Sequence, residues 1–397
     1  MRLTRRDFVK EATLISLAPT VPTFLAQTAR AAGPSLDDRI LVVIQLDGGN
    51  DGLNTVVPYA DDNYKRLRPK LAIEKSRVRR LNDAVGLNPV MRDAQDLFHE
   101  GRLAIVQGVG YPNPNKSHDV SRSIWETARF DPTEHNGIGW IGRALDEGRA
   151  PKAGGPSSVL VGPEALPVTL RGRKSIAATL SNLDDMVLAD KSKPAVSGAA
   201  EESLLAFVRR SEVDAVATAD RLQQAAKPRP DSATLPYGEL PKRLALISRL
   251  IQSDFGARVY YAVQTGYDTH VYQRETHERL LRELSDGLRF FLNELKQAKL
   301  DDRVVVMTFS EFGRRADENA SEGTDHGTAA PVLLAGPKVK AGLHGTAPSL
   351  SKLKGVDLVA TLDFRQVYQA VLESWLRLPA APALSGRFPP LDLFGRS

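Results

Sequence analysis

The chain contains no cysteine, and this absence excludes several kinds of site at once. Disulfides, thiolate zinc sites, iron–sulfur clusters and cysteine nucleophiles all need that side chain. Any metal ion must therefore be held by carboxylate, imidazole or main-chain groups. Aromatic residues make up only 6% of the chain, and the net charge is +5 over 397 residues. There is no stripe of basic and aromatic residues, so we expect no nucleic-acid partner.

Several signatures of catalysis are also missing. The sequence has no G-x-S-x-G turn, no Walker phosphate loop and no H-E-x-x-H motif, and Gly48, Gly49 and Gly52 do not fit G-x-G-x-x-G. With 42% hydrophobic and 25% charged residues, the composition is that of an ordinary globular protein. The length suits one large α/β enzyme, and we predict a single domain over residues 32–397.

The first 31 residues have the order of features found in an export signal. Arg5 and Arg6 precede Asp-Phe-Val-Lys, an uncharged stretch follows over residues 12–29, and Ala29-Arg30-Ala31 is a small-x-small cleavage pattern. We predict a twin-arginine signal peptide over residues 1–31, with the twin-arginine export machinery as partner. The protein is then exported folded and is periplasmic or secreted; an amphipathic N-terminal helix is the alternative. No later apolar run has membrane length, so we expect no permanent membrane span.

Short apolar runs alternate with helical patterns along the rest of the chain. Leucines and aromatics recur at helical spacing over residues 280–295 and 364–376, and residues 201–224 also read as a helix. Strands alternating with helices predict an α/β fold with a mostly parallel central sheet and helices on both faces. We expect six strands, over residues 39–45, 103–107, 158–161, 259–263, 303–308 and 332–335.

Polar residues follow these apolar runs directly. In an open parallel sheet, ligands bind beyond the carboxyl ends of the strands, so these residues should converge on one edge. The pair Asp268 and His270 has the spacing that points both side chains the same way on an extended segment. Carboxylate and imidazole together suit a divalent metal ion. The residues concerned are Asp47, Asp268, His270, Ser310 and Glu311.

Each of these residues also has a structural interpretation. Asp47 lies beside a glycine turn, where an aspartate often only caps its own backbone. His270 could be a structural histidine. Ser117 and His118 begin a predicted helix, whose exposed amides could hold an anion. Either could therefore be a nucleophile or an acid, or Ser117 could merely cap the helix.

Four segments together resemble the bacterial "domain of unknown function 1501" family. They are LDGGNDGLNTVVP at residues 46–58, GYDTH at 266–270, TFSEFGR at 308–314 and GTDHGTAAPVLLAG at 323–336. The resemblance spans essentially the whole mature chain. The sequence is similar, more distantly, to the alkaline phosphatase and sulfatase superfamily. That resemblance implies an alkaline phosphatase/sulfatase-like arrangement of the sheet.

The resemblance also implies roles for particular residues. Asp47 matches the aspartate after the first strand, Ser117 the nucleophile at a helix start, and Asp268 with His270 one metal site. The segment DHGTAAPVLLAGP matches the last metal-binding element, which makes Asp325 and His326 further metal candidates. Superfamily members usually carry Asp-His for the second metal, whereas this chain has Ser310-Glu311. The second site is therefore altered to Glu311 ligation, or lost.

The reaction implied is hydrolysis of phosphate or sulfate esters with a divalent metal ion: zinc, manganese, iron or calcium. The substrate could be a small-molecule or glycan ester. Arg314 could clamp a non-bridging oxygen of the ester, or form a surface ion pair. The main alternative is a non-catalytic exported protein that binds an envelope partner or glycan on the same scaffold. A redox cofactor enzyme is a third possibility, suggested only by the export route.

Overall fold

The computed structural model describes residues 39–134, 136–148, 156–180 and 234–395. The predicted signal peptide and the predicted helix over residues 201–224 lie outside these ranges. No helix within the described ranges has both the length and the apolar character needed to cross a bilayer.

All six predicted strands are present in one nine-stranded sheet. The strand order is β11-β5-β10-β9-β1-β8-β6-β7, with β12 beside β5. The predicted strands are β1 (Ile40–Asp47), β5 (Leu103–Gly110), β6 (Ser158–Val161), β8 (Val259–Thr265), β9 (Val304–Phe309) and β10 (Ala330–Ala335). The additional strands are β7 (Ala177–Leu180), β11 (Gly342–His344) and β12 (Leu362–Asp363).

The direction of the strands decides which loops meet. β1 pairs in parallel with both β8 and β9. β10 is antiparallel to its neighbours β5 and β9, which makes the sheet mostly parallel, as predicted. Because β10 runs the opposite way, the residues that precede it lie at the edge where β1, β8 and β9 end. Loops from before β10 and after the parallel strands therefore share one edge.

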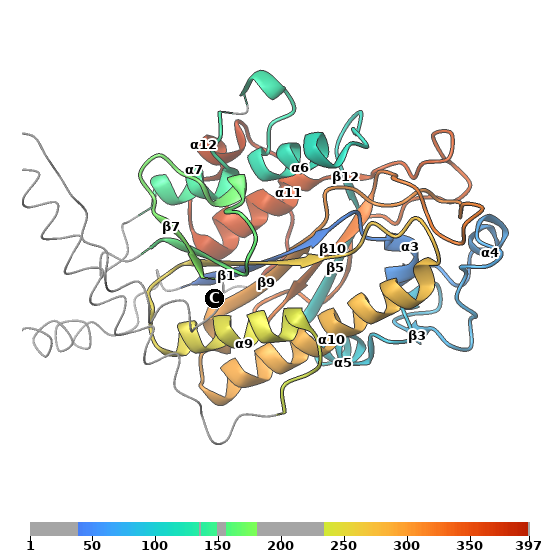
Figure 1. Cartoon of the computed structure of the whole chain (residues 1–397), viewed down its shortest axis with the longest axis horizontal. Helices are drawn as coiled ribbons and strands as arrows, with labels where there is room; N and C mark the ends of the chain where they lie inside the picture. Colours follow the sequence, from blue (N-terminus) through green and yellow to red (C-terminus); the bar gives the residue numbers. More distant parts are fainter. Residues whose placement is uncertain (1–38, 135, 149–155, 181–233, 396–397) are drawn as a thin grey trace, which may run out of the picture. The chain divides into compact units, whose positions relative to one another are not determined.

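Helices cover both faces of the sheet, as predicted (Figure 1). Ile40, Val42 and Ile44 of β1 face one buried cluster, while Leu41 and Val43 face the other. In the view of Figure 1, α5 (Arg92–His99), α9 (Glu239–Gln252) and α10 (Gln273–Gln297) lie below the sheet. The helices α6 (His118–Thr127), α7 (Trp140–Asp146), α11 (Phe364–Gln369) and α12 (Ala380–Leu384) lie above it.

The predicted helix over residues 364–376 consists of α11 continued by a π-helical segment, η6 (Ala370–Leu376). Asp363 caps its start by accepting a hydrogen bond from the amide of Arg365. A small second sheet has the strand order β2-β4-β3. Its strands are β2 (Val56–Val57), β4 (Gly86–Leu87) and β3 (Arg79–Arg80). It packs with α3 (Gly52–Thr55) and α4 (Asp62–Leu67), and the remaining short turns are η1 (Pro132–Glu134), η2 (Val168–Leu170) and η5 (Asp301–Arg303).

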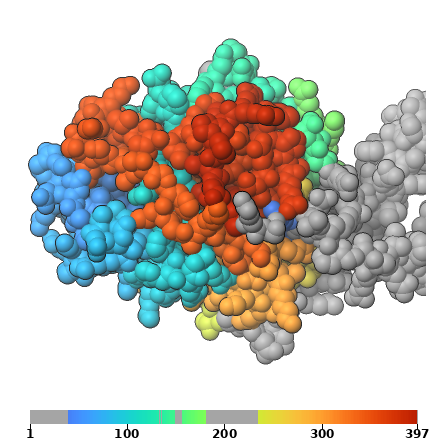
Figure 2. All heavy atoms as spheres, turned by 180° about the vertical axis from the view of Figure 1, so that it is seen from behind, coloured from blue at the N-terminus to red at the C-terminus, as the bar shows by residue number. Residues whose placement is uncertain are grey.

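Seen from behind, residues of the C-terminal third occupy the middle of the surface (Figure 2). They are coloured orange to red, and the blue and cyan residues of the first described segment lie beside them at one end. Segments from opposite ends of the described chain therefore meet on one face. β12, from the C-terminal third, pairs with β5 in the same way.

Candidate metal centre

The glycine turn after β1 allows the loops at this edge of the sheet to touch. Gly48 has a φ of +118°, which side chains with a Cβ rarely adopt, and a Cβ there would lie 2.9 Å from the carbonyl carbon of Tyr267. The β1 turn therefore packs directly against the backbone that carries Asp268. The predicted convergence of polar residues at this edge is confirmed.

Three ligand-type atoms form a triangle at the centre of this edge. The Nε2 atoms of His270 and His326 lie 2.9 Å apart. Asp268 Oδ1 lies 3.0 Å from His270 Nε2 and 3.1 Å from His326 Nε2. Ligand atoms about 2.1 Å from one zinc ion are about 3.0–3.4 Å from each other, so the triangle has the dimensions of a coordination site.

The hydrogen bonds of the Nδ1 atoms of His270 and His326 indicate which ring nitrogens carry the protons. His270 Nδ1 lies 3.1 Å from Asp325 Oδ1, and His326 Nδ1 lies 2.8 Å from the carbonyl oxygen of Lys116. Both partners are acceptors, so a neutral ring at either position carries its proton on Nδ1 and a lone pair on Nε2. Two lone pairs that face each other at this distance repel unless a cation lies between them. The donor set therefore fits a divalent metal ion.

His118 brings a third imidazole to the same place. It is the first residue of α6, and its Nε2 lies 3.5 Å from Asp268 Oδ2. His118, Asp268 and His326 each offer a ligand atom within 4.8 Å of the others. On its far side, His118 Nδ1 lies 2.9 Å from Glu311 Oε1. That hydrogen bond raises the pKa of His118.

The charge states at this edge suit a metal ion. Burial acts to raise the pKa of Asp268, but the hydrogen bond and the charge of Arg314, with smaller contributions from His326 and His270, lower it to about 2. The carboxylate is therefore ionised at any physiological pH. Burial lowers the pKa of His326, which favours the neutral ring. Metal ions bind ionised carboxylates and neutral imidazoles, so both groups are in the required state.

Glu311 and Asp325 were predicted as metal ligands. In the structure each lies behind a histidine of the site, with a carboxylate oxygen beside the Nδ1 of that ring. The buried Glu311 carboxylate accepts hydrogen bonds from the Gly48 amide at 2.9 Å and from the His118 ring. Asp325 holds the His270 ring and also pairs with Arg315 at 3.1 Å. Both carboxylates orient histidines. Such partners fix the ring position and raise the basicity of the inner nitrogen.

Asp47, also a predicted metal ligand, is held by partners outside the triangle. Its Oδ1 pairs with Arg122 Nη2 at 3.0 Å and accepts a hydrogen bond from Gln45 at 3.0 Å. Burial and the nearby charge of Glu311 raise the pKa of Asp47. The strand pleat explains this position, because the side chain of the last β1 residue points toward α6 rather than toward the β8 loop.

Arg314 is not available to clamp a substrate oxygen, which corrects that prediction. Its guanidinium is buried and donates to the carbonyl oxygens of Gly49 at 2.7 Å, Thr324 at 2.8 Å and Tyr267 at 3.0 Å. It also donates to Asp268 Oδ1 at 2.7 Å. A buried charge needs such a full set of acceptors. Arg314 therefore fastens three loops of the site together and holds the Asp268 carboxylate.

Ser117, the predicted nucleophile, makes no side-chain hydrogen bond to the cluster within the described ranges. The residue is exposed, and its side chain makes no capping hydrogen bond to α6. Its backbone amide donates to Asn115 Oδ1 at 2.7 Å. The next residue, His118, is the one that faces the sheet edge. Ser117 is the N-cap residue, with extended backbone (φ −79°, ψ 131°), and α6 itself begins at His118.

Sequence reasoning missed Arg122. It lies four residues after His118 on α6, and its side chain is 33% exposed. Its Nη2 lies 3.0 Å from Asp47 and 4.0 Å from Glu311. Residues four apart share one helix face, so the spacing from His118 was the available signal. Arg122 offers the accessible cation that Arg314 does not.

One comparison with known proteins identifies a family. The family model described as "Protein of unknown function (DUF1501)" matches residues 38–378. No curated protein matches the chain.

The chain is similar, at low identity, to a number of solved structures. Murine ectonucleotide pyrophosphatase/phosphodiesterase 5 is 10% identical with a TM-score of 0.42, covering 89% of this chain and 97% of that one. The phosphonate monoester hydrolase from Silicibacter pomeroyi is 9% identical with a TM-score of 0.39, covering 88% and 75%. The alkaline phosphatase from the Antarctic bacterium TAB5 is 9% identical with a TM-score of 0.34, covering 77% and 94%.

Proposed function

The chain belongs to the DUF1501 family, and from the geometry of its site we propose that it is an exported, metal-dependent hydrolase of phosphate or sulfate esters. One observation carries the proposal. The lone-pair nitrogens of His270 and His326 face each other at 2.9 Å, beside the ionised carboxylate of Asp268. Two imidazole nitrogens and an ionised carboxylate that lie within 3.1 Å of one another suit a divalent cation.

The ligand set narrows the choice of metal. Asp268, His270 and His326 would hold the ion, with His118 next to them. Imidazole nitrogens suit zinc, manganese or iron, whereas calcium takes oxygen ligands. When bound, a divalent ion supplies positive charge that polarises a phosphoryl or sulfuryl oxygen.

The protein's own residues supply the proton transfer and the anion binding. The Nδ1–H group of His118 donates a hydrogen bond to the buried Glu311 carboxylate, which leaves Nε2 as the reactive nitrogen. From there His118 takes a proton from an attacking water or returns one to the leaving oxygen. The exposed face of Arg122 lies on the same side of α6 and binds a non-bridging ester oxygen.

Metal binding and hydrolysis test the proposal together. Wild-type protein, purified without chelator, is titrated with zinc and assayed against an aryl phosphate, a phosphodiester and an aryl sulfate. We expect about one zinc per chain for the wild type and for His99→Ala, a matched histidine exposed on α5. His326→Ala and Asp268→Asn should lose zinc and hydrolysis. Unchanged zinc affinity in both site variants would refute the proposal.

A second function remains because of one specific observation. Ser117 is exposed, and within the described ranges its hydroxyl makes no hydrogen bond to His118, Asp268, His270 or His326. The alternative is an exported protein that binds an envelope partner or glycan without cleaving it. Zinc binding with full loss in His326→Ala, but no hydrolysis of any of the three esters, would favour this alternative.

Export is tested separately with residues 1–31. Fused to a folded reporter in a bacterium with a twin-arginine system, they should direct the reporter to the periplasm. Replacing Arg5 and Arg6 together with lysine should keep the reporter in the cytoplasm, whereas Arg2→Lys, outside the arginine pair, should not. Export that survives the double replacement would show that another route is used.

A further inference from the structure

Gln273, the first residue of α10, is buried where the two segments that carry the proposed metal ligands meet. Its backbone amide donates to the carbonyl oxygen of Glu322 at 2.9 Å, so the start of the helix lies beside the segment that leads to His326. A buried amide side chain is costly unless both of its ends have partners. The partners of Gln273 therefore show which parts of the chain it holds.

The carbonyl end of the Gln273 side chain joins the two metal-binding segments. Its Oε1 accepts hydrogen bonds from the hydroxyls of Thr269 at 3.1 Å and Thr324 at 2.5 Å. Thr269 lies between the two ligands of the loop after β8, and Thr324 lies two residues before His326. The backbone amide of Thr324 also donates to the carbonyl oxygen of Thr269 at 3.2 Å. One oxygen atom therefore contacts both segments that supply the triangle.

The amide end of the same side chain is anchored to a buried ion pair. Gln273 Nε2 donates to Asp51 Oδ2 at 2.5 Å, and that oxygen pairs with Arg68 at 2.6 Å. Burial acts to raise the pKa of Asp51, but the charge of Arg68 holds it below its usual value. An ionised carboxylate only accepts hydrogen bonds, so the NH₂ group must face Asp51 and the carbonyl oxygen must face the threonines. The ion pair thereby fixes the orientation of the Gln273 amide.

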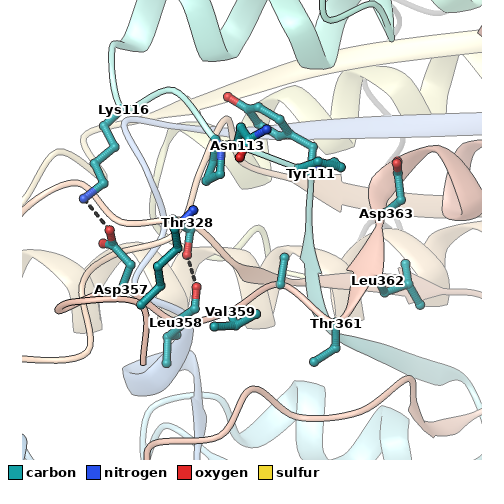
Figure 3. Close-up of a pocket in the computed structure, with 14 residues that line it drawn as sticks. Tyr111, Asn113, Lys116, Thr328, Asp357, Leu358, Val359, Thr361, Leu362 and Asp363 are labelled. Atoms are coloured by element: carbon teal, nitrogen blue, oxygen red, sulfur yellow. Dashed lines mark hydrogen bonds and ion pairs between the residues drawn. The ribbon is translucent and has the colours of Figure 1, made fainter. Parts of the chain in front are cut away.

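The opposite end of the His326 segment is fastened to another part of the chain (Figure 3). Thr328, two residues after His326, donates its hydroxyl to the carbonyl oxygen of Leu358. Lys116, whose carbonyl oxygen holds the His326 ring, pairs with Asp357 at 2.6 Å. These contacts hold His326 against the segment that precedes β12. They do not set its distance from the loop after β8.

We propose that Gln273 is a positioning residue of the metal centre, which sets the separation between the His326 segment and the loop after β8. The inference rests on the proposed function for the metal ligands themselves. Ligands already held at the right separation lose less conformational freedom when the ion binds, so the affinity is higher. Arg314 also contacts both segments, through the Thr324 carbonyl oxygen and Asp268. Removing the Gln273 amide therefore weakens metal binding without abolishing it.

A matched pair of glutamines tests this role. Gln273→Met nearly conserves the side-chain volume and removes both ends of the amide. Gln369→Met is the control, because Gln369 is buried on α11 and its amide makes two hydrogen bonds of 2.8 Å with the backbone of Phe388. In zinc titrations of the full-length protein, Gln273→Met should lose about tenfold or more in affinity, while Gln369→Met stays within about twofold of wild type. Equal zinc affinities in the two variants would overturn the proposal.

A double-mutant cycle distinguishes positioning from general loosening of the fold. Thr324→Val removes the hydroxyl that donates to Gln273 and should by itself lower zinc affinity by about threefold or more. The double variant should bind zinc within about twofold of Gln273→Met, because its second substitution removes an interaction that is already lost. Losses that multiply in the double variant would show that Gln273 does not act through Thr324.

Hydrogen exchange in the metal-free protein separates failure of this inference from failure of the proposed function. Exchange of the Thr324 amide reports whether the two segments stay together, since that amide donates to Thr269. Gln273→Met should speed it by about tenfold or more, whereas Gln369→Met should speed exchange of the Phe388 amide instead. If this pattern is found but the wild type binds no zinc, only the proposed function fails. Unchanged exchange of the Thr324 amide in Gln273→Met contradicts the positioning role whether or not zinc binds.

Discussion

Replacing Gly49 with alanine should weaken zinc binding, although Gly49 is not one of the proposed metal ligands. Gly49 has a φ of +87°, and a Cβ there would lie 2.6 Å from Cδ2 of Phe312. The Phe312 ring packs against the rings of His326 at 4.7 Å and His118 at 5.0 Å between centroids. The new methyl group would therefore push Phe312 toward two histidines of the site. Gly101→Ala is the control, since Gly101 has a φ of +75° and nothing within 4 Å of its Cβ position.

The structure gives the expected magnitudes. A left-handed backbone costs an alanine about 1–2 kcal/mol, and both variants carry that cost. Overpacking against Phe312 adds about 1–3 kcal/mol to the Gly49 variant alone. Urea unfolding of the metal-free proteins measures the difference, and zinc titration measures the effect on the site. Gly49→Ala should lose at least about tenfold in zinc affinity, a shift of about 1.4 kcal/mol, while Gly101→Ala keeps it. Equal stability and equal zinc affinity in the two variants would refute the reasoning.

Three further predictions concern single side chains. Burial raises the pKa of Glu126 to about 7. In the unfolded chain the same carboxyl loses its proton near pH 4.5, so the free energy of unfolding should fall by about 3 kcal/mol as the pH rises from about 4.5 to 7. Glu126→Gln keeps an acceptor for the Val168 amide and should abolish that loss, as urea unfolding at several pH values would show. Arg314→Lys should cost about 3 kcal/mol of unfolding free energy because most of its acceptors lose their donor, and a loss below about 1 kcal/mol would contradict this. In ester hydrolysis, Ser117→Ala should stay within about twofold of wild type while His118→Ala loses about a hundredfold or more; the reverse order would restore the serine as nucleophile.

The sequence was sufficient for the sheet and for the edge that carries the site. Apolar runs such as residues 39–45 and 259–263 form strands because a strand covered on both faces needs apolar residues at every position. Asp268 and His270 were paired by their two-residue spacing, and they lie together. His326 followed from the family resemblance, and the antiparallel direction of β10 explains why its preceding loop reaches the same edge.

The sequence could not decide which neighbours of these residues face inward. Ser117 and His118 are adjacent at a helix start, and only the angle at which α6 meets the sheet selects His118. Arg314 follows a strand, where a surface position and a buried one look alike in sequence. Its buried role depends on carbonyl oxygens from three loops, which no local pattern reveals. Glu311 could be placed behind His118 only once both positions were known.

Anomalous diffraction above the zinc edge, from crystals of the zinc-loaded protein, tests the central claim most directly. We expect one peak between the Nε2 atoms of His270 and His326, about 2.0–2.2 Å from both and from Asp268 Oδ1. The peak should be absent in crystals of His326→Ala. A zinc-soaked wild-type crystal without a peak there, or with its peak at Asp47 and Arg122 instead, would contradict the metal centre described here.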